Sequence, residues 1–200
     1  MILAGLAATP LLVLAAKDGG RYAVPALAIF AASMILLYGA STTYHTFNIS
    51  EKVNKVLRKI DHMMIFILIA GSYTPICVIP LRDTVGIPLL ILVWAVAIAG
   101  MLIKAFWITC PKWFSSTIYI AMGWLCVLAM VPLVQTLPTA AFIWLVAGGV
   151  IYTIGGVIYA LKLPLFNAKH QYFGSHEIFH VFVMAGSLCH YVTMFYIATM

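Results

Sequence analysis

Long apolar runs separated by short polar stretches fill this chain. Seven of the runs are long or apolar enough to cross a bilayer, which takes roughly 17 to 25 residues of helix. The runs are continuous rather than alternating, which favours helices over barrel strands. The pattern therefore predicts an all-α integral membrane protein, a seven-transmembrane helix bundle in a single domain of residues 1–200. The expected spans lie near residues 1–16, 22–46, 60–80, 85–107, 115–134, 139–161 and 177–199.

The composition excludes an ordinary soluble domain. Hydrophobic residues make up 64% of the chain and charged residues 8%, whereas soluble domains average about 25% charged. The first run has no basic stretch before it, since Lys17 is the first positive residue and follows the run, so we interpret it as a span and not as a secretory signal. The net charge of +6 does not indicate a nucleic-acid partner, because the basic residues lie at the ends of the runs.

The distribution of these basic residues predicts the orientation of the bundle. Eight lysines and arginines fall on one side and three on the other, and the richer side is expected to be cytoplasmic. The N-terminus and the loop 47–59 are then inside the cell and the C-terminus is outside. A short chain without a targeting sequence suits a multi-pass protein of the plasma membrane, the inner membrane of a bacterium. The two sets are Lys52, Lys55, Arg58, Lys59, Lys104, Lys112, Lys162 and Lys169, against Lys17, Arg21 and Arg82.

Polar residues that could form a metal site converge on the cytoplasmic side. His45 ends the second span, Asp61 begins the third, and His176 and His180 begin the seventh. Residues four apart share a helix face, which pairs Ser41 with His45 and His176 with His180. Three imidazole nitrogens and an open position are typical of catalytic zinc. The sequence therefore predicts a zinc site near the cytoplasmic leaflet, with the three histidines as ligands.

Each of these residues also has a simpler interpretation. Asp61 could cap the third helix, where the helix dipole favours a negative charge. Ser41 could bond back to a carbonyl of its own helix. Single histidines in spans are more often packing or interfacial residues, which is the role we expect for His62, His170 and His190. The cysteines have no metal-ligand spacing, so we expect Cys77, Cys110, Cys126 and Cys189 to be packing residues.

Three segments give the chain a family resemblance. They read STTYH at 41–45, DH at 61–62 followed by GSYTP at 71–75, and GSHEIFH at 174–180. These segments resemble the signatures of bacterial hemolysin III proteins, which are similar to progestin and adipoQ receptors and more distantly to alkaline ceramidases. The resemblance implies a seven-helix bundle with zinc held by His45, His176 and His180. It also implies that Asp61 holds the zinc-bound water, with Ser41 nearby. The long N-terminal region of the receptor branch has no counterpart here.

The predicted site suits a zinc-dependent hydrolase of lipid amides, with Asp61 and Ser41 as the catalytic residues. Zinc would polarise the scissile carbonyl and a carboxylate would take the proton from water. An apolar bundle interior would accept the acyl chain of a membrane lipid. The alternative is a non-enzymatic protein with structural zinc, either a sensor or a cytolysin of the kind that the hemolysin name implies. A pore is disfavoured, because the polar groups cluster at one depth instead of lining a helix face.

The pattern H-E-x-x-H offers a second carboxylate, Glu177. Soluble zinc peptidases with this pattern use the glutamate as the base. With about 100° per residue, His176 and His180 lie about 40° apart around the helix, and Glu177 points about 80° from their mean direction. Asp61 comes from another helix and could approach the open side of the site. We therefore predict that Asp61, not Glu177, is the base.

Overall fold

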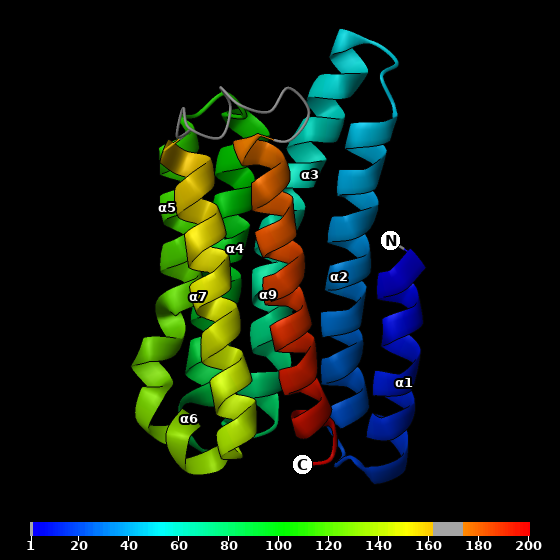
Figure 1. Ribbon diagram of the computed structural model, residues 1–200. Coiled ribbons are helices and arrows are strands. Elements are labelled where there is room, and N and C mark those ends of the chain that lie inside the picture. Colours follow the sequence, from blue (N-terminus) through cyan, green and yellow to red (C-terminus); the bar gives the residue numbers. More distant parts are fainter. Residues whose placement is uncertain (1, 162–173) are drawn as a thin grey trace.

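The chain folds as a bundle of helices that stand side by side (Figure 1). The computed structural model describes residues 2–161 and 174–200, and within these ranges the regular elements are helices. Near the centre, α9 contacts α1, α2, α3 and α7. The elements are α1 (Ile2–Asp18), α2 (Ala23–Thr46), α3 (Glu51–Val78), η1 (Arg82–Gly86), α4 (Ile87–Phe106), α5 (Lys112–Gly123), η2 (Trp124–Ala129), α6 (Met130–Thr136), α7 (Thr139–Leu161) and α9 (Ser175–Ala198).

Six stretches of helix in the described part of the chain are long and apolar enough to cross a membrane. Two of them run through a distorted turn, η1 before α4 and η2 between α5 and α6. The first helix, α1, has 17 residues and is therefore about 26 Å long, less than the roughly 30 Å of a hydrocarbon core. It covers only the lower part of the bundle in Figure 1. The protein is thus an all-helical membrane protein with six candidate spans, and seven spans remain a prediction.

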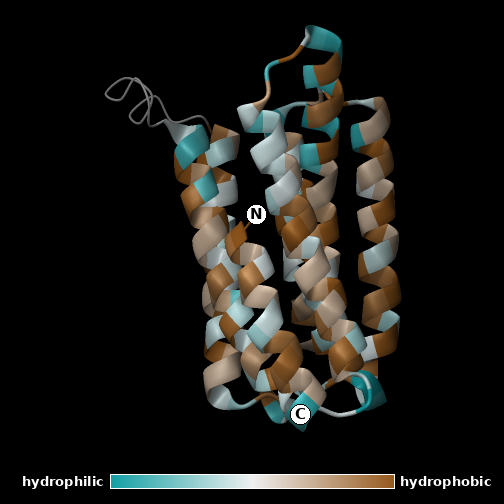
Figure 2. Cartoon of the chain, turned by 90° about the vertical axis from the view of Figure 1, so that its right-hand side faces the viewer, coloured by the Kyte–Doolittle hydropathy of each residue, from teal (hydrophilic) through white to brown (hydrophobic). Residues whose placement is uncertain are grey.

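The hydrophobic residues follow the long middle of the helices, and many of the hydrophilic ones gather near the helix ends (Figure 2). Lys52 and Lys112 lie at the upper end of Figure 1, whereas Lys17, Arg21 and Arg82 lie at the lower end. Lys162 and Lys169 are outside the described residues. The two sets of basic residues in the described chain thus lie at opposite ends of the bundle. Which of the two ends faces the cytoplasm remains a prediction.

The third helix begins earlier than expected. We expected a loop over 47–59, but α3 starts at Glu51 and carries the helix beyond the rest of the bundle (Figure 1). The Ser50 hydroxyl accepts a hydrogen bond of 3.3 Å from the Val53 amide, and Glu51 supplies a negative charge in the first turn, where the helix dipole favours it. Hydropathy marks where a helix enters the membrane, whereas the cap decides where the helix starts.

The fifth expected span is interrupted halfway by the 3₁₀ turn η2. The Tyr73 hydroxyl reaches this turn from α3, donating to the Gly123 carbonyl at 2.6 Å and accepting from the Cys126 amide at 2.8 Å. Backbone groups freed inside a membrane need such partners, because lipid provides none. The hydroxyl of a neighbouring helix therefore stabilises the break.

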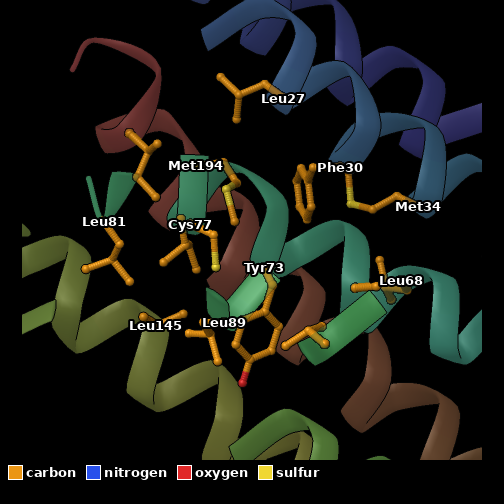
Figure 3. Packing of buried hydrophobic residues seen from close by; sticks show 14 of the residues in the cluster. Leu27, Phe30, Met34, Leu68, Tyr73, Cys77, Leu81, Leu89, Leu145 and Met194 are labelled. Atoms are coloured by element: carbon orange, nitrogen blue, oxygen red, sulfur yellow. The ribbon is translucent and has the colours of Figure 1, made fainter. Parts of the chain in front are cut away.

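Small residues let the helices approach closely around this core. A side chain on Gly71 would overlap Ser33 across the α2–α3 contact, and one on Gly155 would lie 2.6 Å from the Phe182 Cβ across the α7–α9 contact. Close backbone approach is what drives helix association in lipid, where burial of apolar groups gives no net gain. Figure 3 shows the apolar side chains that fill the space between α2, α3, α4, α7 and α9, among them Phe30, Tyr73 and Met194.

Candidate metal centre and cavity

Three histidines from two helices meet at the upper end of the bundle in Figure 1. His45 lies in the last turn of α2, and His176 and His180 lie in the first two turns of α9. Possible ligand atoms of the three side chains lie within 4.8 Å of one another. His45 is exposed and the other two are half-buried. The structure thus brings together the three residues that the sequence assigned to the metal.

Two of the three spacings between the ring nitrogens match the edge of a tetrahedral zinc site. The Nε2 atom of His176 lies 3.4 Å from that of His45 and 3.3 Å from that of His180. With zinc–nitrogen bonds of 2.0–2.1 Å, the edge of a tetrahedron is about 3.3 to 3.4 Å. The rings are tilted at 47° between His45 and His176 and at 83° between His176 and His180, so their nitrogens converge instead of stacking. These three residues fit a zinc ion and leave a fourth position.

Ser41 of α2 and Asp61 of α3 lie near this group of histidines. Asp61 is buried, with 8% of its surface exposed, and it lies close enough to His45 to interact electrostatically. Ser41, one helical turn before His45, lines the same cavity as Asp61. Because α3 begins ten residues earlier, at Glu51, the interpretation of Asp61 as a helix cap is wrong. The Asp61 carboxylate therefore lies within α3 and does not cap its start.

Glu177 bonds to the backbone at the start of its own helix. It is exposed, and its Oε2 accepts a hydrogen bond of 2.8 Å from the Gly174 amide at the start of α9. A glutamate that bonds back to the residue before its helix completes the N-terminal cap. Its backbone partner gives this carboxylate a structural role.

A cavity of about 160 Å³ extends from this site into the bundle. Ser41, Asp61, His176 and His180 form part of its wall, and the rest of the wall is mainly apolar and aromatic. Concave, mostly apolar pockets with a few convergent polar groups are typical of sites for small molecules and lipids. The apolar part of the wall includes Leu37, Ile65, Leu68, Ile69, Ile120, Phe179 and Val183.

Further polar residues of this wall escaped the sequence analysis. The hydroxyls of Tyr38 and Tyr152, which line the cavity, each lie 2.7 Å from the buried Ser187 Oγ, and these contacts join α2, α7 and α9. The helical repeat of the sequence could have indicated Tyr38 and Ser187. Tyr38 precedes His45 by seven residues and Ser187 follows His180 by seven, and residues seven apart share a face.

The simpler roles expected for the remaining histidines and cysteines hold only in part. His62 Nδ1 lies 2.9 Å from the Arg58 carbonyl, yet the residue also lines the cavity. Both ring nitrogens of His190 are buried, and His170 lies outside the described residues. Cys77 and Cys189 are buried packing residues, whereas the Cys110 sulfur lies 3.2 Å from the buried Lys104 ammonium.

Comparison with known proteins assigns the chain to a family. The family model described as Haemolysin-III related matches residues 1–191. This chain belongs to the haemolysin III-related family. It is 37% identical over 177 residues to a Hemolysin-3 homolog of Bacillus subtilis (strain 168), covering 88% of this chain and 79% of the relative. It is also 37% identical over 188 residues to Hemolysin-3 of Bacillus cereus, covering 94% and 82%.

A more distant similarity extends to receptors of eukaryotes. The Adiponectin receptor protein of Drosophila melanogaster is 27% identical over 176 residues, which cover 78% of this chain and 39% of the receptor. The family and the membrane-spanning helices together make this haemolysin III-related protein a multi-pass protein of the plasma membrane.

Proposed function

We propose that this haemolysin III-related protein is a zinc-dependent hydrolase of lipid amides, with its site near the cytoplasmic leaflet. The observation that supports this most directly is that Ser41, Asp61, His176 and His180 line one apolar cavity, and that His45 lies beside His176. Zinc held by the histidines would supply Lewis acidity, polarising the amide carbonyl and making a water molecule more acidic. A purely structural zinc site would need neither the open fourth position nor the cavity.

The residues of the chain divide the reaction between them. Asp61 takes the proton from the attacking water and passes it to the amide nitrogen as the carbon–nitrogen bond breaks, giving a fatty acid and an amine. The Ser41 hydroxyl orients the Asp61 carboxylate. The apolar wall holds the acyl chain and keeps bulk water away from it, which strengthens the electrostatic interactions of the site.

The experiment is a hydrolysis screen with a matched inactive protein. Purified, zinc-loaded protein in lipid vesicles is incubated with N-acyl lipids, namely a ceramide, an N-acylethanolamine and an N-acyl amino acid, and released fatty acid is measured by mass spectrometry. Fatty acid release is expected from the wild type and not from a His176→Ala, His180→Ala double variant. A fully zinc-loaded wild type that cleaves none of these lipids would overturn the hydrolase.

A second candidate is a membrane sensor in which zinc is structural. The observation that favours it is the burial of Asp61 beside His45, since a carboxylate oxygen is also a zinc ligand and a fourth protein ligand would close the site. The name of the Drosophila relative, an adiponectin receptor, points the same way. Loss of zinc on removing the Asp61 charge would support the sensor, because an open catalytic site holds its metal without that carboxylate.

A further inference from the structure

A second cavity, of about 50 Å³, continues the first one deeper into the bundle. The two cavities have a wall in common, so they lie end to end. His190 belongs to this shared wall and lies ten residues beyond His180 on α9, which places it about 15 Å further along the helix. The shared wall consists of Ser72, Tyr73, Gly123, Trp124, Gly149 and His190.

His190 has no hydrogen-bond partner among the described residues. Both ring nitrogens are buried and unpaired; the Leu145 carbonyl lies near the ring but does not meet hydrogen-bonding geometry. The ring fits beside α7 because Gly148 has no side chain there. A neutral imidazole carries one donor and one acceptor, and leaving a buried polar group unpaired costs about 1–3 kcal/mol. A packing residue would not need to be a histidine at this position.

The other polar side chains of the shared wall are already paired within the protein. Ser72 donates to a carbonyl of its own helix, and Tyr73 and Trp124 donate to groups of neighbouring elements, so none of these donors needs an occupant of the cavity. The bonds run from Ser72 to the Leu68 carbonyl at 2.8 Å, from Tyr73 to the Gly123 carbonyl at 2.6 Å, and from Trp124 to the Thr153 hydroxyl at 2.9 Å. Among the described residues of this wall, His190 is the one whose ring nitrogens need a hydrogen-bond partner from a ligand.

A water molecule is a poor partner for His190. Buried waters typically make about three hydrogen bonds, and here the donors of the neighbouring polar side chains are already used within the protein. A hydroxyl group on a chain that apolar walls already hold needs no such set of partners. We propose that the two cavities form one channel for an acyl chain that carries a hydroxyl group along its length, and that His190 binds this hydroxyl.

The order of polar and apolar residues along the two cavities matches such a molecule. Its polar end lies at Asp61 and the histidines, the hydroxyl lies at His190, and the rest of the chain enters the second cavity, which is lined largely by apolar residues. This inference rests on the proposed function, since it names the lipid chain of the same cavity, but binding tests it without turnover. The apolar lining of the second cavity includes Ile76, Leu81, Leu89, Leu133, Leu145 and Val146.

The test compares two fatty acids that differ by one hydroxyl, stearate and 12-hydroxystearate. The affinities of both fatty acids for the purified, zinc-loaded protein are measured by competition with a fluorescent fatty acid. The ratio of the two affinities is then compared between variants, because the different partition of the two fatty acids into detergent cancels in that comparison. The wild type is expected to favour 12-hydroxystearate about tenfold more than His190→Leu does, the factor that corresponds to about 1.4 kcal/mol, a typical net hydrogen bond. His190→Gln, which keeps a donor and an acceptor, should retain most of the preference.

The control is Ser33→Ala, which removes a buried hydroxyl that bonds the Phe30 carbonyl and lies outside both cavities. Its ratio should equal that of the wild type. An equal ratio in the wild type and in His190→Leu, with stearate bound by both, would overturn the proposal. So would a folded, zinc-loaded wild type that binds neither fatty acid. If the preference for 12-hydroxystearate depends on His190 but the protein hydrolyses no lipid amide, this inference stands and the proposed hydrolase function is wrong.

Discussion

The Nε2 atoms of His45 and His176 lie 3.4 Å apart, although 131 positions separate the two residues in the chain. One closes α2 and the other opens α9, so the pair ties together the ends of two helices that contact each other. Two imidazole nitrogens at this spacing can be neighbours on one tetrahedral zinc ion. The site therefore depends on the packing of the bundle as well as on the residues themselves.

Zinc content tests this relationship. Purified wild type should hold about one zinc per chain, because three converging nitrogens form an open zinc site. His45→Ala, His176→Ala and His180→Ala should each lose most of the metal, as measured by elemental analysis. His62→Ala, which removes a nearby imidazole outside the group, should retain it. Unchanged zinc content in all three variants would show that these histidines do not hold the metal.

The two carboxylates near the histidines should behave differently. Asp61→Asn should keep most of the zinc and lose about 10²-fold or more of lipid-amide turnover if Asp61 supplies general-base catalysis. Glu177→Gln should cost far less turnover, because the Glu177 carboxylate faces the Gly174 amide. Turnover and zinc are measured on the same preparations. The reverse ranking would make Glu177 the base, and loss of zinc in Asp61→Asn would make Asp61 a ligand.

The orientation of the bundle can be measured with two cysteine variants at opposite ends. Lys52→Cys lies on the exposed extension of α3, and Asp18→Cys lies at the exposed end of α1. If the more basic end is cytoplasmic, a membrane-impermeant thiol reagent should label Asp18→Cys in intact cells and Lys52→Cys only after lysis. Wild type gives the background from the native cysteines. Labelling in the opposite order would invert the bundle and place the histidines outside.

Tyr73→Phe should destabilise the protein without touching the histidines. The variant leaves the Gly123 carbonyl and the Cys126 amide without their hydroxyl partner, at a cost of about 1–3 kcal/mol in the free energy of unfolding. Tyr196→Phe is the control, since that side chain is 38% exposed. Thermal unfolding in detergent compares the two. Equal melting temperatures would show that the break at η2 does not depend on Tyr73.

Two adjacent glycines of α7 give a matched pair for the helix packing. A Cβ on Gly148 would overlap the His190 ring, whereas one on Gly149 would meet nothing within 4 Å. Gly148→Ala should therefore destabilise the protein by about 1–3 kcal/mol, the usual cost of overpacking. Gly149→Ala should be neutral or slightly stabilising, because alanine favours the helix. Equal effects in thermal unfolding would contradict the close α7–α9 contact.

Local signals in the sequence predicted much of this site. The spacing of His176 and His180 on one helix face, and the positions of His45 and Asp61 at the ends of apolar runs, could be read without a structure because helix periodicity and hydropathy are local properties. Helix caps are local too, but they do not follow hydropathy, so the hydropathy pattern alone predicts a start for α3 that is nine residues too late.

The sequence by itself determined that this is a helical membrane protein, and it supplied the three histidines and the carboxylate that meet at one end of the bundle. Only the tertiary structure decided that His176 Nε2 lies within 3.4 Å of the Nε2 atoms of His45 and His180, that Glu177 caps its own helix, and that His190 lies unpaired between two cavities. These features depend on which helices pack together and on how the small residues between them set their separation. Such contacts join residues far apart in the chain, and a hydropathy pattern carries no information about them.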